Sequence, residues 1–550
     1  MSIPSEATRE EEEEEEEEPQ QERNPEPSHH PAAPSDELFD ISTTVDPGYI
    51  ISLIRQVLPT NVRNCNESVG VNACDASNQG SEEASQAGGR EESAVLLSQN
   101  NDYNSEVEAM DSNECTGQDE RDGGSLEKQG GTVGKDIWED CGCILWDLAA
   151  SKTHAEFMVQ NLALDVLLAN LMVPQSVRVT EITLGIIGNL ACHEVSRKHI
   201  ASTNGLIEVI VDKLFLDDTP CLCEAYRVLT LGLQGCGCNA WAEALGPENI
   251  LSRVLWVAEN TLNPQLMEKS VGLLLAILQS KQEIVASLLP KLMQLGLLGL
   301  LVSLLTSEMS KLAGERVPER YPILDLILRT IEALSVIDDY SQEVSSNVEL
   351  LRLLIDLVKF PDKIEVADSC VTGAVLIANI LTDVVDPALE ISQDLSFLQG
   401  LFDIFPFASG DVEARSAIWS IIARLLVQVQ ATLMSSSSLR QYVAVFVSKS
   451  EVIEDELLDQ PLNSCENGAK LSATTIALRK IISILGQWTS SKESVEGNSM
   501  GDNHVIDETI ARLLELSHKN TKCGSCRYAT ELINMMSLLQ ICEVIPLPVA

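Results

Sequence analysis

The chain has 550 residues, of which 45% are hydrophobic and only 4% are aromatic. Asp and Glu number 83 against 37 Lys and Arg, which gives a formal net charge of -46. Such a charge repels nucleic-acid phosphates and anionic lipid, so we expect no direct binding to either, and basic proteins are the electrostatically favoured partners. The longest apolar tract, Leu288–Leu305, is interrupted by Pro290 and Lys291, so no transmembrane segment is predicted.

Residues 1–37 are predicted to form a disordered acidic tail. They contain the uninterrupted run Glu10–Glu18, followed by several prolines. Like charges and prolines together oppose collapse. The tail is either a solubilising segment or a dock for basic partners, and the sequence leaves both open.

Residues 38–59 are predicted to hold one short amphipathic helix. Apolar residues follow helical spacing from Ile50 onward, Pro47 suits the first turn, and Pro59 suits the end. This helix either folds back as an N-terminal cap on the repeat domain or docks as a linear motif in another protein's groove. Residues 60–134, rich in Ser, Asn, Gly, Asp and Glu, are predicted to be a disordered linker.

Residues 135–550 are predicted to form an all-α, right-handed α-solenoid of armadillo or HEAT type. A glutamate followed by small residues at four-residue intervals recurs at Glu181, Glu224 and Glu268. The first of these helices is apolar nearly all round, so it must be covered on both sides. A period of about 45 to 50 residues fits units of two or three helices, of which we expect roughly eight or nine.

The later repeats are less regular. Trp419 stands on the otherwise aliphatic helix predicted at Ala414–Val429, and an acidic loop is predicted at Glu451–Lys470. A last pair of helices is predicted at Val505–Ser517 and Tyr528–Cys542.

Two motifs near the start of the repeat domain are distinctive. Ile137–Leu148 reads I-W-E-D-C-G-C-I-L-W-D-L, and Glu181–Cys192 reads E-I-T-L-G-I-I-G-N-L-A-C, with Phe157 and Leu162 between them. These landmarks at this spacing resemble the serum amyloid A-like 1 family of armadillo-fold proteins, in a plant-type or divergent form. The resemblance implies a nuclear, non-enzymatic protein linked to cell proliferation, without catalytic residues or a cofactor, and the cytosol is the alternative compartment.

Asn189 is the most specific candidate for a residue that binds a partner. In armadillo import receptors an inner-helix asparagine holds the backbone of an extended peptide, with a tryptophan one turn before it. Here the tryptophan position is Gly185, and the equivalent asparagine positions are Gly232 and Ala276, so the aligned ladder is absent. Asn189 is therefore either a polar partner of a neighbouring helix or loop, or a contact in a peptide groove. The candidate partner-binding residues are Glu181, Gly185, Asn189 and Trp419.

Motifs that carry chemistry are scarce. The one tight C-x-x-C, at Cys523 and Cys526, is a candidate thiol-redox pair, although no strand–helix context for it is evident. Other cysteine pairs are C-x-C, which is not a zinc spacing, so no metal site is predicted. With seven histidines and no nucleotide or nucleophile motif, we predict no enzyme activity and no cofactor. Fifteen cysteines without a signal peptide indicate reduced thiols in the nucleus or cytosol.

The sequence therefore favours a monomeric, non-enzymatic scaffold or adaptor that binds protein partners through a groove of the solenoid. One alternative is a carrier or chaperone of basic protein cargo, to which the Glu10–Glu18 run contributes affinity. The other is a thiol-redox protein that uses Cys523 and Cys526.

Overall fold

The computed structural model describes residues 45–59, 130–314, 316–383, 391–430, 434–459, 472–493 and 503–521. The chain divides into two units, Met1–Pro47 and Gly48–Ala550, and every helix considered below lies in the second, apart from the first residue of α1. The predicted tail at 1–37, most of the predicted linker and the predicted helix Tyr528–Cys542 lie outside the described residues.

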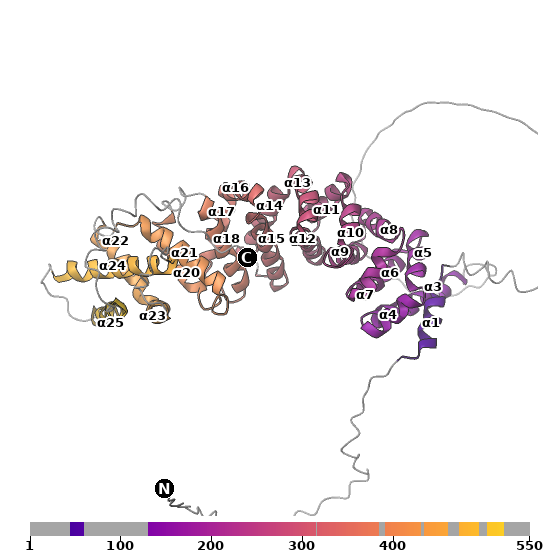
Figure 1. Ribbon diagram of the computed structural model, residues 1–550, viewed down its shortest axis with the longest axis horizontal. Coiled ribbons are helices and arrows are strands. Elements are labelled where there is room, and N and C mark those ends of the chain that lie inside the picture. The colour runs from indigo at the N-terminus through magenta and orange to yellow at the C-terminus, as the bar shows by residue number, and fades with distance from the viewer. Residues whose placement is uncertain are drawn as a thin grey trace, which may run out of the picture. The chain divides into compact units, whose positions relative to one another are not determined.

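The regular elements within these ranges are helices, and most of them fall into three rows (Figure 1). In each row a helix packs on the helix in the same place of the next repeat. The first-helix row comprises α4 (Lys152–Gln160), α7 (Glu194–Ser202), α10 (Cys238–Leu245) and α13 (Gln282–Gln294). The second-helix row comprises α5 (Ala163–Met172), α8 (Leu206–Asp212) with η1 (Lys213–Phe215), α11 (Glu248–Asn260), α14 (Leu297–Gly314), α17 (Val348–Val358), α20 (Leu395–Ile404) and α22 (Ser436–Ser448).

The third-helix row holds the longest unbroken series of contacts. It comprises α3 (Gly130–Ala149), α6 (Val177–Ala191), α9 (Thr219–Leu233), α12 (Pro264–Leu278), α15 (Tyr321–Ser335), α18 (Ala367–Asp383), α21 (Val412–Gln428) and α24 (Ala473–Glu493). The remaining elements are α1 (Pro47–Gln56), α16 (Asp338–Ser345), η2 (Pro318–Arg320), α23 (Ser450–Asp459) and α25 (Asn503–Thr521). Within the described ranges this is an all-α solenoid, so the predicted fold class is confirmed.

Local chemistry explains where the third helices begin. Ser176, Asp218 and Asn263 each accept a hydrogen bond from a backbone N–H in the first turn of α6, α9 and α12. Gly205 and Gly296 precede second helices with φ values of 78° and 91°, a conformation that side-chain-bearing residues rarely adopt. Ten of the fifteen residues of α6 are buried, as expected for a helix covered on both sides.

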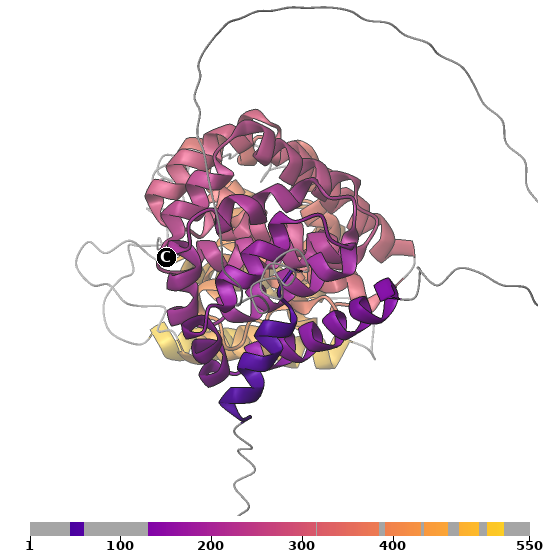
Figure 2. The same ribbon diagram turned by 90° about the vertical axis from the view of Figure 1, so that its right-hand side faces the viewer.

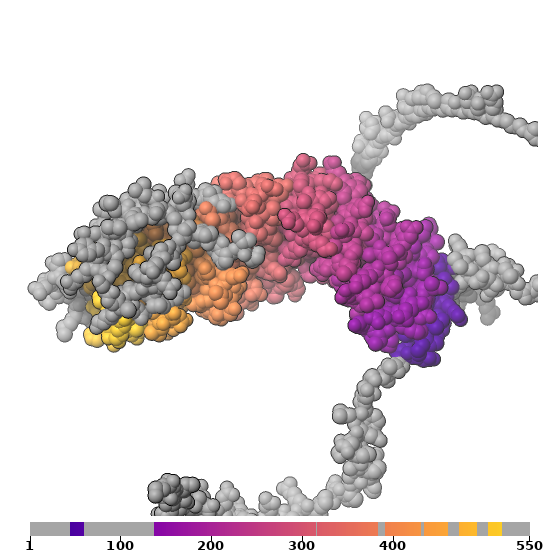
Figure 3. Space-filling model, viewed as in Figure 1, coloured from indigo at the N-terminus to yellow at the C-terminus, as the bar shows by residue number. Residues whose placement is uncertain are grey.

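Hydrogen bonds between neighbouring repeats reveal the repeat length. The bonds from Asn189 to Trp146, Cys221 to Val177 and Lys291 to Gly246 join residues 43, 44 and 45 positions apart. The interval is 53 positions for the bond from Arg320 to Met267. The third helices from α9 to α21 begin 45, 57, 46 and 45 positions apart, so the spacing matches the predicted period except where α14 and η2 lengthen the repeat before α15. Figure 3 shows a continuous packed surface across these repeats on the face in view.

Helix α1 packs on the first repeat, against α3 (Figures 1 and 2). Its apolar side chains are buried, among them Ile50 and Leu53, which are 1% and 2% exposed. Just after the helix, the carbonyl oxygen of Val57 accepts hydrogen bonds from Trp138 Nε1 (2.9 Å) and Asn170 Nδ2 (2.8 Å). These contacts match the interpretation of the segment as a cap.

Three details differ from the sequence-based expectations. Helix α3 begins at Gly130, inside the predicted linker. The predicted acidic loop at Glu451–Lys470 is wrong over its first part, because α23 occupies Ser450–Asp459 and buries Ile453 and Leu457 one turn apart. Helix α14 has the length and composition of a membrane span, although 44% of that stretch is buried inside the protein.

Candidate functional site

The solvent-facing side of the third-helix row carries paired charges in four consecutive repeats. Each pair joins a carboxylate and a cation on the same helix, at N–O distances of 2.7, 2.6, 2.9 and 3.9 Å. We call this set the ionic row; it consists of Arg178 and Glu181 on α6, Glu224 and Arg227 on α9, Glu268 and Lys269 on α12, and Asp325 and Arg329 on α15. The pairs on α6, α12 and α15 are half-exposed, and pairs of this kind contribute only about 0.3–0.5 kcal/mol each to stability.

Arg227 links three helices at the start of the ionic row. Its Nη1 donates to Asn189 Oδ1 (2.9 Å) and its Nη2 to the carbonyl oxygen of Gly185 (3.0 Å). Asn189 Nδ2 in turn donates to the carbonyl oxygen of Trp146 on α3 (2.8 Å). The guanidinium lies over Gly188, where a Cβ atom would overlap it. Arg227 was not predicted from the sequence. The small residue Gly188 was the one sign that another side chain packs against α6 at this point.

The structure assigns different roles to the predicted partner-binding residues. Glu181 is half-buried and paired with Arg178, and it lies on the ionic row. Asn189 is half-buried, and both ends of its amide bond to neighbouring helices, which matches its interpretation as a polar partner of a helix.

Two of the predicted partner-binding residues, Gly185 and Trp419, are buried. Gly185 is buried against the indole of Trp146, so its role is to let α3 and α6 approach closely. Trp419 is 1% exposed and packs among aromatic rings, with Phe405 at 5.0 Å and Phe402 at 6.0 Å between ring centroids. A side chain enclosed in this way cannot contact a partner, so it belongs to the core.

A second asparagine repeats the arrangement of Asn189 further along the row. Asn379 on α18 donates from Nδ2 to Ser335 Oγ on α15 at 3.0 Å, across 44 positions. The sequence around it, L-I-A-N-I-L, is similar to I-I-G-N-L-A in α6. Asn379 was not predicted, because Asn189 was compared only with the equivalent positions of the next two repeats.

Carboxylates on α15 are poorly compensated. Burial raises the pKa of Asp325, an effect that Arg329 opposes and Asp368 reinforces. Burial likewise raises the pKa of Glu332, with Arg329 again opposing and Asp325 reinforcing the shift. Both groups would gain from an additional cation nearby.

The buried cysteines Cys223 and Cys370 do not have reactive surroundings. Burial raises the pKa of the Cys223 thiol to about 11 and that of Cys370 to about 12. Cys523 and Cys526 lie outside the described residues, so their redox role stays a prediction. In the described part of the chain, no three His, Cys, Asp or Glu side chains come together as metal ligands would.

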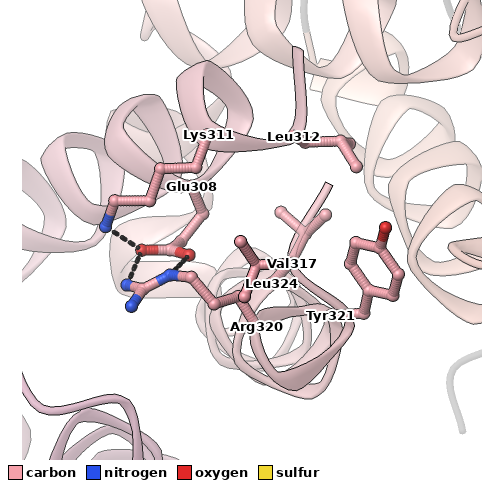
Figure 4. A pocket seen from close by; sticks show the side chains of 7 residues that line it. All are labelled: Glu308, Lys311, Leu312, Val317, Arg320, Tyr321 and Leu324. Atoms are coloured by element: carbon pink, nitrogen blue, oxygen red, sulfur yellow. Dashed lines mark hydrogen bonds and ion pairs between the residues drawn. The ribbon is translucent and has the colours of Figure 1, made fainter. Parts of the chain in front are cut away.

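A small cavity lies between α14 and α15 (Figure 4). Beside it the buried carboxylate of Glu308 accepts hydrogen bonds from Arg320 Nε (2.7 Å), Arg320 Nη2 (2.5 Å) and Lys311 Nζ (2.9 Å). The polar groups here satisfy one another, so this cluster is a clasp between two helices at the point where the repeat lengthens.

Three rows of helices, with polar contacts between consecutive third helices, define an α-solenoid of armadillo type. Among solved structures, an engineered protein aligns over 71% of this chain and 86% of its own, at 15% identity and a TM-score of 0.45. A designed armadillo repeat protein in complex with the peptide (KR)4 aligns over 44% of this chain and 92% of its own, at 15% identity and a TM-score of 0.36.

The sequence is similar to proteins named saal1. It is 29% identical to Protein saal1 of Danio rerio over 154 residues, which cover 28% of this chain and 33% of the relative. It is 28% identical to Protein SAAL1 of Homo sapiens over 129 residues, which cover 23% of this chain and 27% of the relative. The match thus spans about a third of the relatives' length or less, and no family model matches the chain. The resemblance stated from the two motifs is confirmed.

Proposed function

We propose that this chain is a non-enzymatic scaffold that binds a segment of a protein partner along the ionic row. The observation that carries the proposal is the recurrence of half-exposed charge pairs on α6, α9, α12 and α15. The pairs on α6, α12 and α15 add little to stability and are available to exchange contacts with a partner, whereas Arg227 on α9 also holds Asn189 and Gly185.

The dimensions of the row suit an extended segment. Neighbouring helix axes lie about 8–10 Å apart, so four consecutive third helices extend over roughly 25–30 Å. An extended chain advances about 3.3 Å per residue, and roughly eight residues would therefore follow the ionic row.

The electrostatics favour a partner with basic residues near α15. A lysine or arginine placed beside Asp325 and Glu332 would favour their charged forms, which burial now disfavours. The net charge of -46 adds long-range attraction to basic proteins.

The nuclear location and the link to cell proliferation are proposals that rest on the resemblance to the saal1 proteins. Imaging of the tagged full-length chain in cells tests the location, and a purely cytosolic signal would contradict it. The carrier alternative is tested by a version that lacks residues 1–37: if the basic partners disappear with that segment, the tail is the dock.

A charge-reversal experiment tests the scaffold proposal. Glu268 of the ionic row is 41% exposed, and Asp368 on α18, whose charge acts on Asp325 of the row, is exposed, so both can be changed to Lys without disturbing the core. The matched control reverses Glu349 and Asp356 on α17, in the second-helix row, which are 48% and 45% exposed. Quantitative proximity labelling in cells should show loss of partners for Glu268→Lys/Asp368→Lys and an unchanged set for the control. An unchanged partner set for both double variants would reject the ionic row as the binding surface.

A further inference from the structure

Large apolar side chains are exposed at the ends of second helices in three consecutive repeats. Met172 at the end of α5 is 68% exposed, Phe215 in η1 is 48% exposed, and Trp256 in α11 is 50% exposed. Leu262, just after α11, is 94% exposed. We call these four residues the rim patch. Isolated exposed apolar residues are common on proteins, so the question is whether these belong to one surface.

Side-chain hydrogen bonds connect the segments that carry the patch. Lys213 Nζ donates to the carbonyl oxygen of Leu171 (2.8 Å), which joins η1 to the end of α5. Arg253 Nε donates to the carbonyl oxygen of Leu214 (2.8 Å), which joins α11 to η1. Each bond involves a residue next to, or one turn from, a member of the patch. Met172, Phe215 and Trp256 therefore lie on segments of the second-helix row that are bonded to one another, and we call these segments the strip.

Trp256 is held in place although half of it faces solvent. The guanidinium of Arg253 lies 4.5 Å from the centroid of the indole. Arg253 is itself fixed, because Nη2 also bonds to the carbonyl oxygen of Leu216 (2.9 Å) and to Asp217 (3.1 Å). An aromatic side chain stacked on a fixed cation loses little conformational freedom when a partner covers it. Tryptophan in such a position is a typical energetic centre of an interface.

The charges around the patch indicate what would cover it. Exposed carboxylates surround it at Asp212, Asp217 and Glu259, and Asp217 is 92% exposed. These carboxylates outnumber the two cations of the strip, Lys213 and Arg253, and Arg253 is paired with Asp217. A second copy of this chain, with its net charge of -46, is an unfavourable occupant. A basic segment of another protein complements the surface.

The geometry points to the rim patch as a docking site for a basic amphipathic segment of a partner protein. The apolar side chains of that segment would cover Phe215 and Trp256, and its lysines or arginines would lie beside Asp212 and Glu259. This site lies on the second-helix row, so it is separate from the ionic row of the third helices. Either surface can fail its test without affecting the other.

Binding of defined peptides to the full-length chain tests the docking site. The probe is a fluorescent 18-residue peptide with leucine at helical i, i+3, i+4 and i+7 spacing and lysine elsewhere, used at physiological salt. One comparison peptide replaces each lysine by glutamate, and another scrambles the leucine positions. We expect the lysine peptide to bind best, and Trp256→Ala to weaken its binding at least tenfold, with a smaller loss for Phe215→Ala.

Tyr49→Ala is the matched control, because Tyr49 is an aromatic residue of similar exposure, 45%, outside the patch. It should leave binding unchanged, and thermal melting should show that all three variants remain folded. Equal binding of the lysine peptide to Trp256→Ala and to the unmodified chain would overturn the proposal. Absence of binding, or equal binding of the glutamate peptide, would do the same. Loss of a homo-oligomer in Trp256→Ala, measured by light scattering, would assign the patch to a second copy instead.

Discussion

Two glycines of α6 set how closely its neighbours in the third-helix row approach. Trp146 covers Gly185 from the side of α3, and Arg227 covers Gly188 from the side of α9. The sequence analysis placed Gly185 at a peptide-binding position, because the tryptophan of other armadillo proteins stands there. In this chain a tryptophan from the preceding helix lies against that position instead.

Gly185→Ala should lower the stability of the first repeats. The new Cβ would overlap the Trp146 indole, and forcing that contact apart costs roughly 1–3 kcal/mol. Thermal unfolding followed by circular dichroism measures the effect. Gly299→Ala in α14 is the control, because nothing lies within 4 Å of its added Cβ and the change should stabilise by about 0.5–1 kcal/mol. Equal melting temperatures for the two variants would contradict the proposed close contact.

Glu308 should make stability depend on pH. Burial raises its pKa, but hydrogen bonds from Arg320 and Lys311 outweigh burial, and the net pKa lies below the ordinary value. A carboxyl group whose pKa is lower in the folded state contributes stability at neutral pH, and this contribution is lost as pH falls through its folded pKa.

Glu308→Gln should therefore cost roughly 3 kcal/mol at pH 7, because it leaves Arg320 without its buried partner. The difference from the unmodified chain should shrink as the pH falls below the ordinary glutamate pKa of about 4.3 and toward the lower pKa of folded Glu308. Melting temperatures at pH 7, 5 and 3.5 measure this. Glu349→Gln, at an exposed pair on α17, should have no measurable effect at any of these values.

At the scale of the element, recurring landmarks and apolar spacing were enough to predict helices at α6, α9 and α12, whereas no helix was predicted at α24 and polar composition was misleading at α23. Helix α23 was predicted as a loop because acidic residues dominate it, yet Ile453 and Leu457 stand one turn apart and are fully buried. Two apolar positions in a ten-residue helix are a weak local signal. The packing of α23 against α25, which lies more than forty residues later, adds the stabilisation that the local sequence does not indicate.

The candidate site was less predictable than the fold. Arg227 and Asn379 act through partners 38 to 44 positions away, so their roles depend on the exact register of neighbouring repeats. A period known only to about five residues cannot place such partners opposite each other. Trp419 could not be placed from the sequence either. A single aromatic residue on an aliphatic helix gives the same sequence pattern whether its side chain faces solvent or the core.

Release of α1 should loosen the first repeat alone. Leu53→Asp places a charge where the side chain is 2% exposed, so α1 should detach from Trp138. Hydrogen exchange followed by mass spectrometry should then show faster exchange in α3 and α5 and unchanged exchange in α15 and α18. Tyr49→Asp adds the same charge at a 45% exposed position of α1 and should leave exchange in α3 unchanged. Faster exchange along the whole row in Leu53→Asp would contradict a local cap.

At the scale of the whole molecule, each repeat contacts mainly its neighbours in the three rows. Stability in such an array is close to a sum of repeat and interface terms, so distant repeats can open separately. The Glu308–Arg320 clasp lies where the interval between bonded residues grows to 53 positions.

Thiol labelling should report such opening. At pH 8 a thiol with a pKa of about 12, as at Cys370, is roughly one part in ten thousand thiolate, and its side chain is fully buried. We expect a maleimide to modify the exposed Cys192 and Cys236 within minutes, and Cys223 and Cys370 only as denaturant unfolds their repeats. Modification of Cys370 as fast as Cys192 in the native protein would contradict the packing around α18.

The cap at α1 has a consequence for biosynthesis. The chain leaves the ribosome in order, and Asn170, which bonds to Val57, is made 113 residues after it. At about 5–20 residues per second, that delay is on the order of ten seconds. A helix as short as α1 is only marginally stable by itself, so its apolar face, with Ile50 and Leu53, has no partner during this interval. In every round of translation, the nascent chain must keep its first helix from other apolar surfaces until α5 has emerged.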